Sequence, residues 1–156
     1  MANICSFEMR VKGRDTRGFI NALRQRGKYW IGRGAEFDEV IDNGVICLNG
    51  WCKWSLASSL TGCANSFKKE PDGWDICDKL KAKEIIPLTL QEACEFFGVE
   101  IEAWSDECGM GFAEHIKIKG NEYLINECHD YIEEFDEVSG EGTVTVKPDG
   151  FYEFDM

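Results

Sequence analysis

Residues 99–120 of the chain read VEIEAWSDECGMGFAEHIKIKG, and the alternation of apolar and polar residues in this stretch decides the fold class. A period of two residues is typical of a strand with one buried face, and it runs through Val99–Ala103 and again through Phe112–Ile118. Between the two runs, two glycines flank a methionine, and glycine adopts positive φ without steric cost. The stretch therefore predicts a strand, a tight turn and a second strand. The turn comprises Gly109, Met110 and Gly111.

One residue breaks the alternation of the second strand. Glu114 falls on the face that otherwise carries apolar residues, and its neighbour His115 suggests a general acid–base pair. Successive residues of a strand point to opposite faces, so these two side chains cannot share one pocket. We therefore assign no catalytic residue and predict that the protein is not an enzyme. Glu114 is expected to bind the turn amides, with His115 on the outer face, and a small enzyme with a pocket around Glu114 stays as a second alternative.

Two helices are expected before this hairpin. Asp15 is a candidate N-cap of the first helix, because its side chain can accept a hydrogen bond from a free backbone amide. The second helix covers Thr89–Phe97, where Thr89 and Glu92 match a capping box and a glycine follows the last apolar residue. Both helices have one apolar face, which predicts that they pack against a sheet.

A hairpin and an irregular connection lie between these helices. Asn43 and Gly44 form the preferred pair for a two-residue hairpin turn, and apolar residues flank them over residues 37–48. Residues 61–87 mix turn signals with isolated apolar pairs, so they predict a loop-rich connection with one short helix near residues 74–80.

The C-terminal part, from about residue 121, is expected to form an acidic helix and a hairpin. Leu124, Cys128 and Ile132 are spaced for one face of a helix, with acids on the other face. Residues 143–154 predict a terminal hairpin. The whole order predicts an α+β fold, namely a ferredoxin-like (split βαβ) antiparallel sheet with helices on one face and this C-terminal extension.

Length and composition predict a single domain, residues 1–156. The chain is 44% hydrophobic and 12% aromatic, which suits a globular core. No run is long and apolar enough to span a bilayer, and the N-terminus lacks the layout of a signal peptide. We therefore expect a cytoplasmic protein with no membrane partner, and we make no prediction of its oligomeric state.

The eight cysteines are spaced irregularly and contain no C-x-x-C pair, which predicts free thiols in a reducing compartment. The candidate zinc ligands are Cys108, His115, Cys128 and His129. Structural zinc usually takes its ligands as closely spaced pairs, and adjacent helical residues point about 100° apart. The chain also contains no glycine-rich phosphate loop. Neither a metal ion nor a cofactor is predicted.

Charge is distributed unevenly along the chain. The net charge is −12, yet residues 1–33 carry eight Lys or Arg against two acids. Residues 121–141 carry eight acids and no Lys or Arg. Such an acidic segment repels nucleic acid and attracts a basic protein surface.

Three segments are similar to the corresponding motifs of the YubB-like ferredoxin-like domain family, which plasmids, phages and mobile elements encode. They are MANICSFEMRVKG at 1–13, GWCKWSL at 50–56 and WSDECGMGFAEHIKIKGNEYL at 104–124. The N-terminal Trp-Cys pair usual in that family is Ile4-Cys5 here. That family has no established activity, so the resemblance implies a fold and a mobile-element setting and no catalytic residue.

From these observations we expect a non-enzymatic interaction protein of a phage or mobile element. Its acidic surface would bind a host protein with a basic surface and could imitate nucleic acid in an anti-defence role, a step made by analogy. The predicted acidic interaction surface comprises Glu127, Asp130, Glu133, Glu134 and Glu137.

The alternative is a nucleic-acid-binding module that uses the basic N-terminal segment. Domains of this plan stack bases on aromatic side chains, and Tyr29 and Trp30 are the aromatic residues within that segment. Trp51 and Trp54 are separate aromatic candidates for a binding surface on the open face of the sheet. The acidic remainder of the chain makes nucleic acid the less favoured partner, because its basic segment can be balanced within the molecule.

Overall fold

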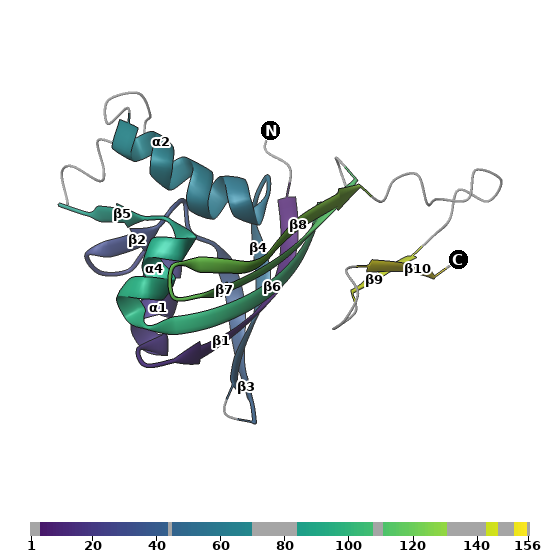
Figure 1. Ribbon diagram of the computed structural model, residues 1–156, viewed down its shortest axis with the longest axis horizontal. Helices are drawn as coiled ribbons and strands as arrows, with labels where there is room; N and C mark the ends of the chain where they lie inside the picture. The colour runs from purple at the N-terminus through teal and green to yellow at the C-terminus, as the bar shows by residue number, and fades with distance from the viewer. Residues whose placement is uncertain are drawn as a thin grey trace.

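A twisted, six-stranded antiparallel sheet forms the centre of the molecule (Figure 1). The computed structural model describes residues 4–43, 45–69, 84–107, 111–130, 143–146 and 152–155. The strands follow the order β3-β4-β1-β6-β7-β8 across the sheet. Their bounds are β1 (Ile4–Gly13), β3 (Glu36–Asp42), β4 (Val45–Lys53), β6 (Val99–Glu107), β7 (Phe112–Lys119) and β8 (Glu122–Asp130). The expected α+β class and antiparallel sheet are confirmed.

Helices α1 (Thr16–Leu23) and α4 (Leu90–Phe97) lie together on one face of this sheet (Figure 1). Both helices begin at the N-caps that the sequence predicts. The Asp15 side chain accepts a hydrogen bond from the Gly18 amide, and the capping box of α4 is formed. Because both N-terminal caps are local interactions, they could be predicted from the sequence.

The core fills the space between these helices and the sheet. Alternate residues of β1, β6 and β7 point toward the helices and are buried, as the two-residue period predicts. The helices contribute their apolar faces to the same cluster. Its largest fully buried side chains include Met9, Phe19, Ile20, Leu23, Leu48, Leu90, Ile101, Ile116 and Ile118.

A second, smaller sheet was not predicted. Strand β2 (Tyr29–Ile31), which follows α1, pairs in parallel with β5 (Ile86–Leu88), which precedes α4. Each strand has three residues, too few for a period of two to be recognisable. The expected C-terminal hairpin is confirmed as β9 (Thr143–Val146) paired with β10 (Tyr152–Asp155).

The helix expected from about residue 121 was wrong for residues 122–130. These residues form β8, which pairs with β7 in the main sheet, so the sheet continues past the predicted boundary of the extension. Gly120 has φ +62° and turns the chain back so that β8 can pair with β7. The backbone hydrogen bonds of the sheet outweighed the helical spacing of the apolar residues. The register also shifts between Lys117 and Ile118, which pair with Ile125 and Tyr123, so Leu124 is skipped and the two-residue period of β8 is interrupted.

Residues 57–69 form a helix that was not predicted. A π-helical segment η1 (Ala57–Gly62) continues directly into α2 (Cys63–Lys69). The signal was present, because Leu56, Leu60, Cys63, Ala64 and Phe67 are buried at helical spacing. The short helix expected near residues 74–80 lies outside the described residues. Among the described residues, no helix is both long and apolar enough to cross a membrane.

Candidate functional site

Two adjoining cavities form a groove along β4, which we call the basic groove. The outer cavity, of about 480 Å³, lies beside Arg26, Phe37 and Asn49. The inner cavity, of about 350 Å³, continues toward η1 and is lined by Gln25, Arg33 and Ser59 among others. Both cavities share Arg24, Ala35, Glu36 and Trp51.

The groove is built where the chain leaves α1 and approaches η1. The Ala35 amide donates to the Leu23 carbonyl oxygen over 3.0 Å, and the Arg33 amide donates to the Ser59 carbonyl oxygen over 3.0 Å. Gly32 permits this approach, because a Cβ there would lie 2.2 Å from the Ser59 carbonyl oxygen. Residues 32–35 are therefore fixed at both ends and form one wall of the groove.

Positive charge dominates the lining of the groove. Four cationic side chains line it, and Glu36 and Asp38 are the acids that line it among the described residues. Both acids are exposed, as are Arg26 and Lys53, so solvent screens these charges, whereas Arg24 and Arg33 are half-buried. The cations are Arg24, Arg26, Arg33 and Lys53.

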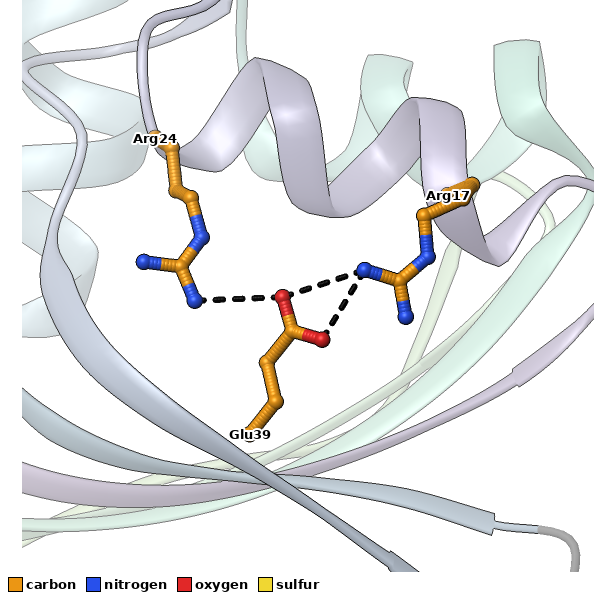
Figure 2. A network of polar contacts seen from close by, with 3 residues as sticks. All are labelled: Arg17, Arg24 and Glu39. Atoms are coloured by element: carbon orange, nitrogen blue, oxygen red, sulfur yellow. Dashed lines mark hydrogen bonds and ion pairs between the residues drawn. The ribbon is translucent and has the colours of Figure 1, made fainter.

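Arg24 is held in place by two neighbours. Its guanidinium donates to Glu39 over 3.1 Å and lies 4.1 Å from the centroid of the Phe37 ring. Figure 2 shows Glu39 rising from β3 between Arg24 and Arg17, which lie toward opposite ends of α1. The hydrogen bond from Arg17, helped by that from Arg24, lowers the pKa of Glu39 below its ordinary value, although burial opposes the shift. Glu39 therefore stays ionised and orients Arg24 over the groove.

Aromatic side chains provide the second feature of the groove. Trp51 lines both cavities and is 37% exposed, so part of its indole is open to a ligand. Trp54 lies behind Arg33, whose guanidinium is 5.3 Å from the centroid of the indole. Both tryptophans named from the sequence thus belong to the groove or its support.

Two of the four described non-glycine residues with positive φ lie at the groove. Gln25 has φ +60° and Trp54 has φ +62°, a region that residues with a Cβ rarely adopt. Each such residue costs on the order of 1–3 kcal/mol and persists only where the surroundings impose it. One strained residue lines the inner cavity and the other supports Arg33, so both strained sites serve this part of the groove.

Two hydrogen-bonding groups of the inner cavity have no partner within the described part of the chain. They are the Gln25 Nε2 amide and the Ser59 Oγ hydroxyl, and both atoms are buried. Ser59 as a whole is only 1% exposed. Buried polar atoms are nearly always hydrogen-bonded, so two unsatisfied groups beside one cavity indicate a site that a ligand completes.

Glu114, the candidate from the sequence, lies elsewhere and has many partners. It is 4% exposed, and its carboxylate accepts hydrogen bonds from the Leu56 amide at 2.8 Å and the Ala57 amide at 3.2 Å. Ser105 Oγ donates to it over 2.8 Å. The expected partners were the amides of the 109–111 turn, whereas the structure directs the carboxylate to the start of the helix that contains η1. Glu114 therefore caps that helix from inside the core.

His115 lies on the opposite face of the sheet, as the alternation requires, but it is not exposed. Its ring stacks on Trp104 with 5.1 Å between centroids, and its Nε2 lies 3.0 Å from Glu102 Oε2. The residue is 7% exposed. Glu114 and His115 do not meet, so the structure does not bring the suggested acid–base pair together.

The predicted turn is described only at Gly111, which has φ +71° as expected and donates its amide to the Glu107 carbonyl oxygen over 2.9 Å. Gly109 and Met110 lie outside the described residues. Of the predicted acidic surface, Glu127 is exposed on β8, and only the backbone of Asp130 is described. A strand does not gather residues three and four apart on one face. Glu133, Glu134 and Glu137 lie outside the described residues.

The six described cysteines are free thiols, in line with the sequence analysis. Cys52 lies directly opposite Cys5 on the neighbouring strand. The contact with Cys5, together with burial, raises the pKa of Cys52, and burial raises the pKa of Cys94 to about 12. Within the described residues, no three histidine, cysteine or acidic side chains are grouped for a metal ion.

Sequence reasoning found some groove residues and missed others. The basic N-terminal segment and both tryptophans were singled out, whereas Gln25, Lys53 and Ser59 were not. The buried helical spacing of residues 56–67 was the available signal for Ser59, since it places that residue on the buried side of a helix. Comparison of the chain with family models, curated proteins and solved structures found no match.

Proposed function

We propose that the protein is a non-enzymatic binding protein whose basic groove takes a short segment of single-stranded nucleic acid. The observation that carries this proposal is the exposed Trp51 in a groove lined by four cations. Single strands are bound through phosphates on cationic side chains and bases stacked on aromatic rings, and each stacked base contributes about 1–3 kcal/mol. The groove supplies both kinds of contact.

The net charge of −12 limits the length of strand that the protein can hold. Phosphates beyond the groove would meet an acidic molecule and be repelled. Charges separated by more than about 8 Å are largely screened at physiological salt, so a few nucleotides within the groove respond mainly to its own cations. A short segment therefore fits the charge distribution better than a long one.

The fold-level part of the proposal is the ferredoxin-like (split βαβ) plan. Four strands of the sheet occur in the order β3-β4-β1-β6, and helices α1 and α4 connect β1 and β6 to the others along the chain. This arrangement supports the split βαβ plan, to which β7 and β8 would be additions. The mobile-element setting rests on the motif resemblance alone.

A second candidate function is binding of a basic host protein by the acidic segment. It is supported by the eight acids and the lack of Lys or Arg in residues 121–141, and by the exposure of Glu127. Replacing the five named acids with Gln or Asn should leave the fold intact and abolish salt-sensitive binding of such a partner. Unfolding of that variant would show that the acids balance the basic segment instead.

The main test is a titration with 12-nucleotide single-stranded DNA and RNA, followed by tryptophan fluorescence and by electrophoretic shift. Affinity should fall as salt rises, because binding releases counterions. Trp51→Ala should weaken binding about tenfold or more, since a stacked base is lost. Arg33→Gln should weaken it and reduce the salt dependence.

Matched variants control for general effects. Phe96→Ala removes another exposed aromatic ring, and Lys119→Gln removes a positive charge on β7, four strands from β3 in the sheet. Neither should change the affinity. Absence of binding at low salt, or equal losses in Trp51→Ala and Phe96→Ala, would overturn the proposal.

A further inference from the structure

We propose that the inner cavity binds a phosphate monoester, so that the groove holds the phosphorylated end of a strand or a free nucleotide. This inference rests on the proposed function, because it names which part of a nucleic acid the groove recognises. It follows from the chemistry of the inner cavity and from the way in which the chain closes it.

The inner cavity presents hydrogen-bond donors and positive charge. Gln25 Nε2 and Ser59 Oγ are buried beside it without a partner among the described residues. Arg24, Arg33 and Lys53 also line it, and the acid that lines it, Glu36, is exposed to solvent. A ligand that satisfies this set must be rich in acceptors and negatively charged. A terminal phosphate has three acceptor oxygens and a charge of about −1.5 to −2 near neutral pH, which is more than a phosphodiester carries.

The inner cavity ends at η1. The backbone at Gly32 is packed so closely on this segment that an added Cβ would lie 2.2 Å from the Ser59 carbonyl oxygen and 2.7 Å from Leu60 Cα. The Arg33 amide also donates a hydrogen bond to the same carbonyl oxygen, so this end of the cavity is closed by backbone. A phosphodiester needs an exit for the chain on both sides, whereas a monoester needs one. The open side leads to Trp51, where the adjoining base can stack.

The local backbone is shaped around this end of the groove. The Cys63 amide donates to the Ser58 carbonyl oxygen five residues earlier, which is the π-helical pattern and occurs often at functional sites. This turn contains Ser59. Gln25 and Trp54, the latter supporting Arg33, have left-handed backbone conformations. The π-helical turn positions Ser59, and the two left-handed residues position Gln25 and Arg33. All three side chains would contact the phosphate.

The test compares ligands that differ only in a terminal phosphate. One 6-nucleotide strand is prepared with a 5′-phosphate, with a 3′-phosphate and with hydroxyls at both ends, and AMP is compared with adenosine. Binding is followed by calorimetry and by the phosphorus NMR shift of the terminal phosphate. We expect a phosphorylated ligand to bind at least tenfold more tightly than its hydroxyl counterpart.

Variants of the inner cavity should remove this preference. Ser59→Ala and Gln25→Ala should each bring the ratio of affinities for phosphorylated and hydroxyl strands close to one. Ser58→Ala is the matched control, because Ser58 is the exposed neighbour of Ser59. It should keep the full preference. Circular dichroism and thermal unfolding establish that each variant is folded, and Gln25→Ala tests the inference even where Ser59→Ala fails to fold.

The outcomes separate this inference from the proposed function. Equal affinity for phosphorylated and hydroxyl strands would overturn the inference and leave nucleic-acid binding intact. Tight binding of AMP without binding of any strand would support the inference with a free nucleotide as ligand and overturn the proposed function. Preference for a phosphorylated strand over AMP would support both. A preference that survives both Ser59→Ala and Gln25→Ala would overturn the assignment to the inner cavity.

Discussion

Glu114 and Ser59 are two buried polar residues at the same helix: Glu114 binds its first amides from β7, and Ser59 is part of the helix itself. The Glu114 carboxylate accepts hydrogen bonds from the first amides of the helix and from Ser105, whereas the Ser59 hydroxyl, one turn later, has no partner among the described residues. Both side chains are almost fully removed from water. The satisfied group belongs to the fold, whereas we propose that the unsatisfied donors beside the cavity belong to a binding site.

Charged side chains near the groove also differ in what they contact. Glu39 binds two arginines and is part of the framework of α1 and β3 (Figure 2). Arg33 is supported from behind by an indole ring and lines the inner cavity. The basic N-terminal segment therefore supplies internal ion pairs through Arg17 and Arg24, and it supplies groove-lining cations through Arg24, Arg26 and Arg33.

The largest expected effect separates the two buried groups by stability. Glu114→Ala should lower the free energy of unfolding by about 3 kcal/mol, because it leaves two helix amides and a hydroxyl without an acceptor in the core. Ser59→Ala should change it by less than about 1 kcal/mol, since no hydrogen bond within the described structure is lost. Urea unfolding of both variants measures the difference. If both variants lost the same free energy of unfolding, Ser59 would also stabilise the fold, and the distinction between the two residues would be wrong.

A second, smaller effect concerns the wall of the groove. Gly32→Ala should destabilise the protein by about 2–3 kcal/mol, because the backbone has φ +51° and the new Cβ would collide with η1. Gly27→Ala is the control. That residue has φ +79° but nothing within 4 Å of the added Cβ, so it should cost about 1 kcal/mol from backbone strain alone. Thermal unfolding should rank them in this order, and a smaller loss for Gly32→Ala would show that the loop can move away from η1.

The smallest effect is the pH dependence from Glu39. Its pKa in the folded protein lies below its ordinary value of 4.5, so the stabilisation is present above about pH 4.5 and is lost as the pH falls through the folded pKa. Glu39→Gln should therefore be less stable than the parent at pH 7, by about 1 kcal/mol or less, and should match it near pH 3. Urea midpoints from pH 3 to pH 7 check this.

Glu39→Gln should also affect ligand binding in the groove. Removing the carboxylate that holds Arg24 frees a positive charge beside the groove, so Glu39→Gln should bind a phosphorylated ligand somewhat more tightly than the parent. A gap in stability that persists unchanged at pH 3 would instead indicate that the Gln side chain disturbs packing rather than an ion pair.

Much of the local structure followed from sequence because its causes are local. The alternation in residues 99–118 predicted β6 and β7, and the two caps at Asp15 and Thr89 predicted where α1 and α4 begin. Residues 122–130 show the limit of this reasoning. Their apolar spacing indicated a helix, but pairing with β7 supplies backbone hydrogen bonds across the sheet, and this decided for a strand.

The sequence by itself determined the antiparallel strands, the capped helices, the basic N-terminal segment and the two tryptophans that line or support the groove. Only the tertiary structure decided that Glu114 binds an amide 58 residues away, and that Gln25, Arg33, Trp51 and Ser59 share one groove. The physical reason is range. Periodicity and caps depend on residues within a few positions, whereas a cavity and a buried hydrogen bond depend on which segments the packed core brings together.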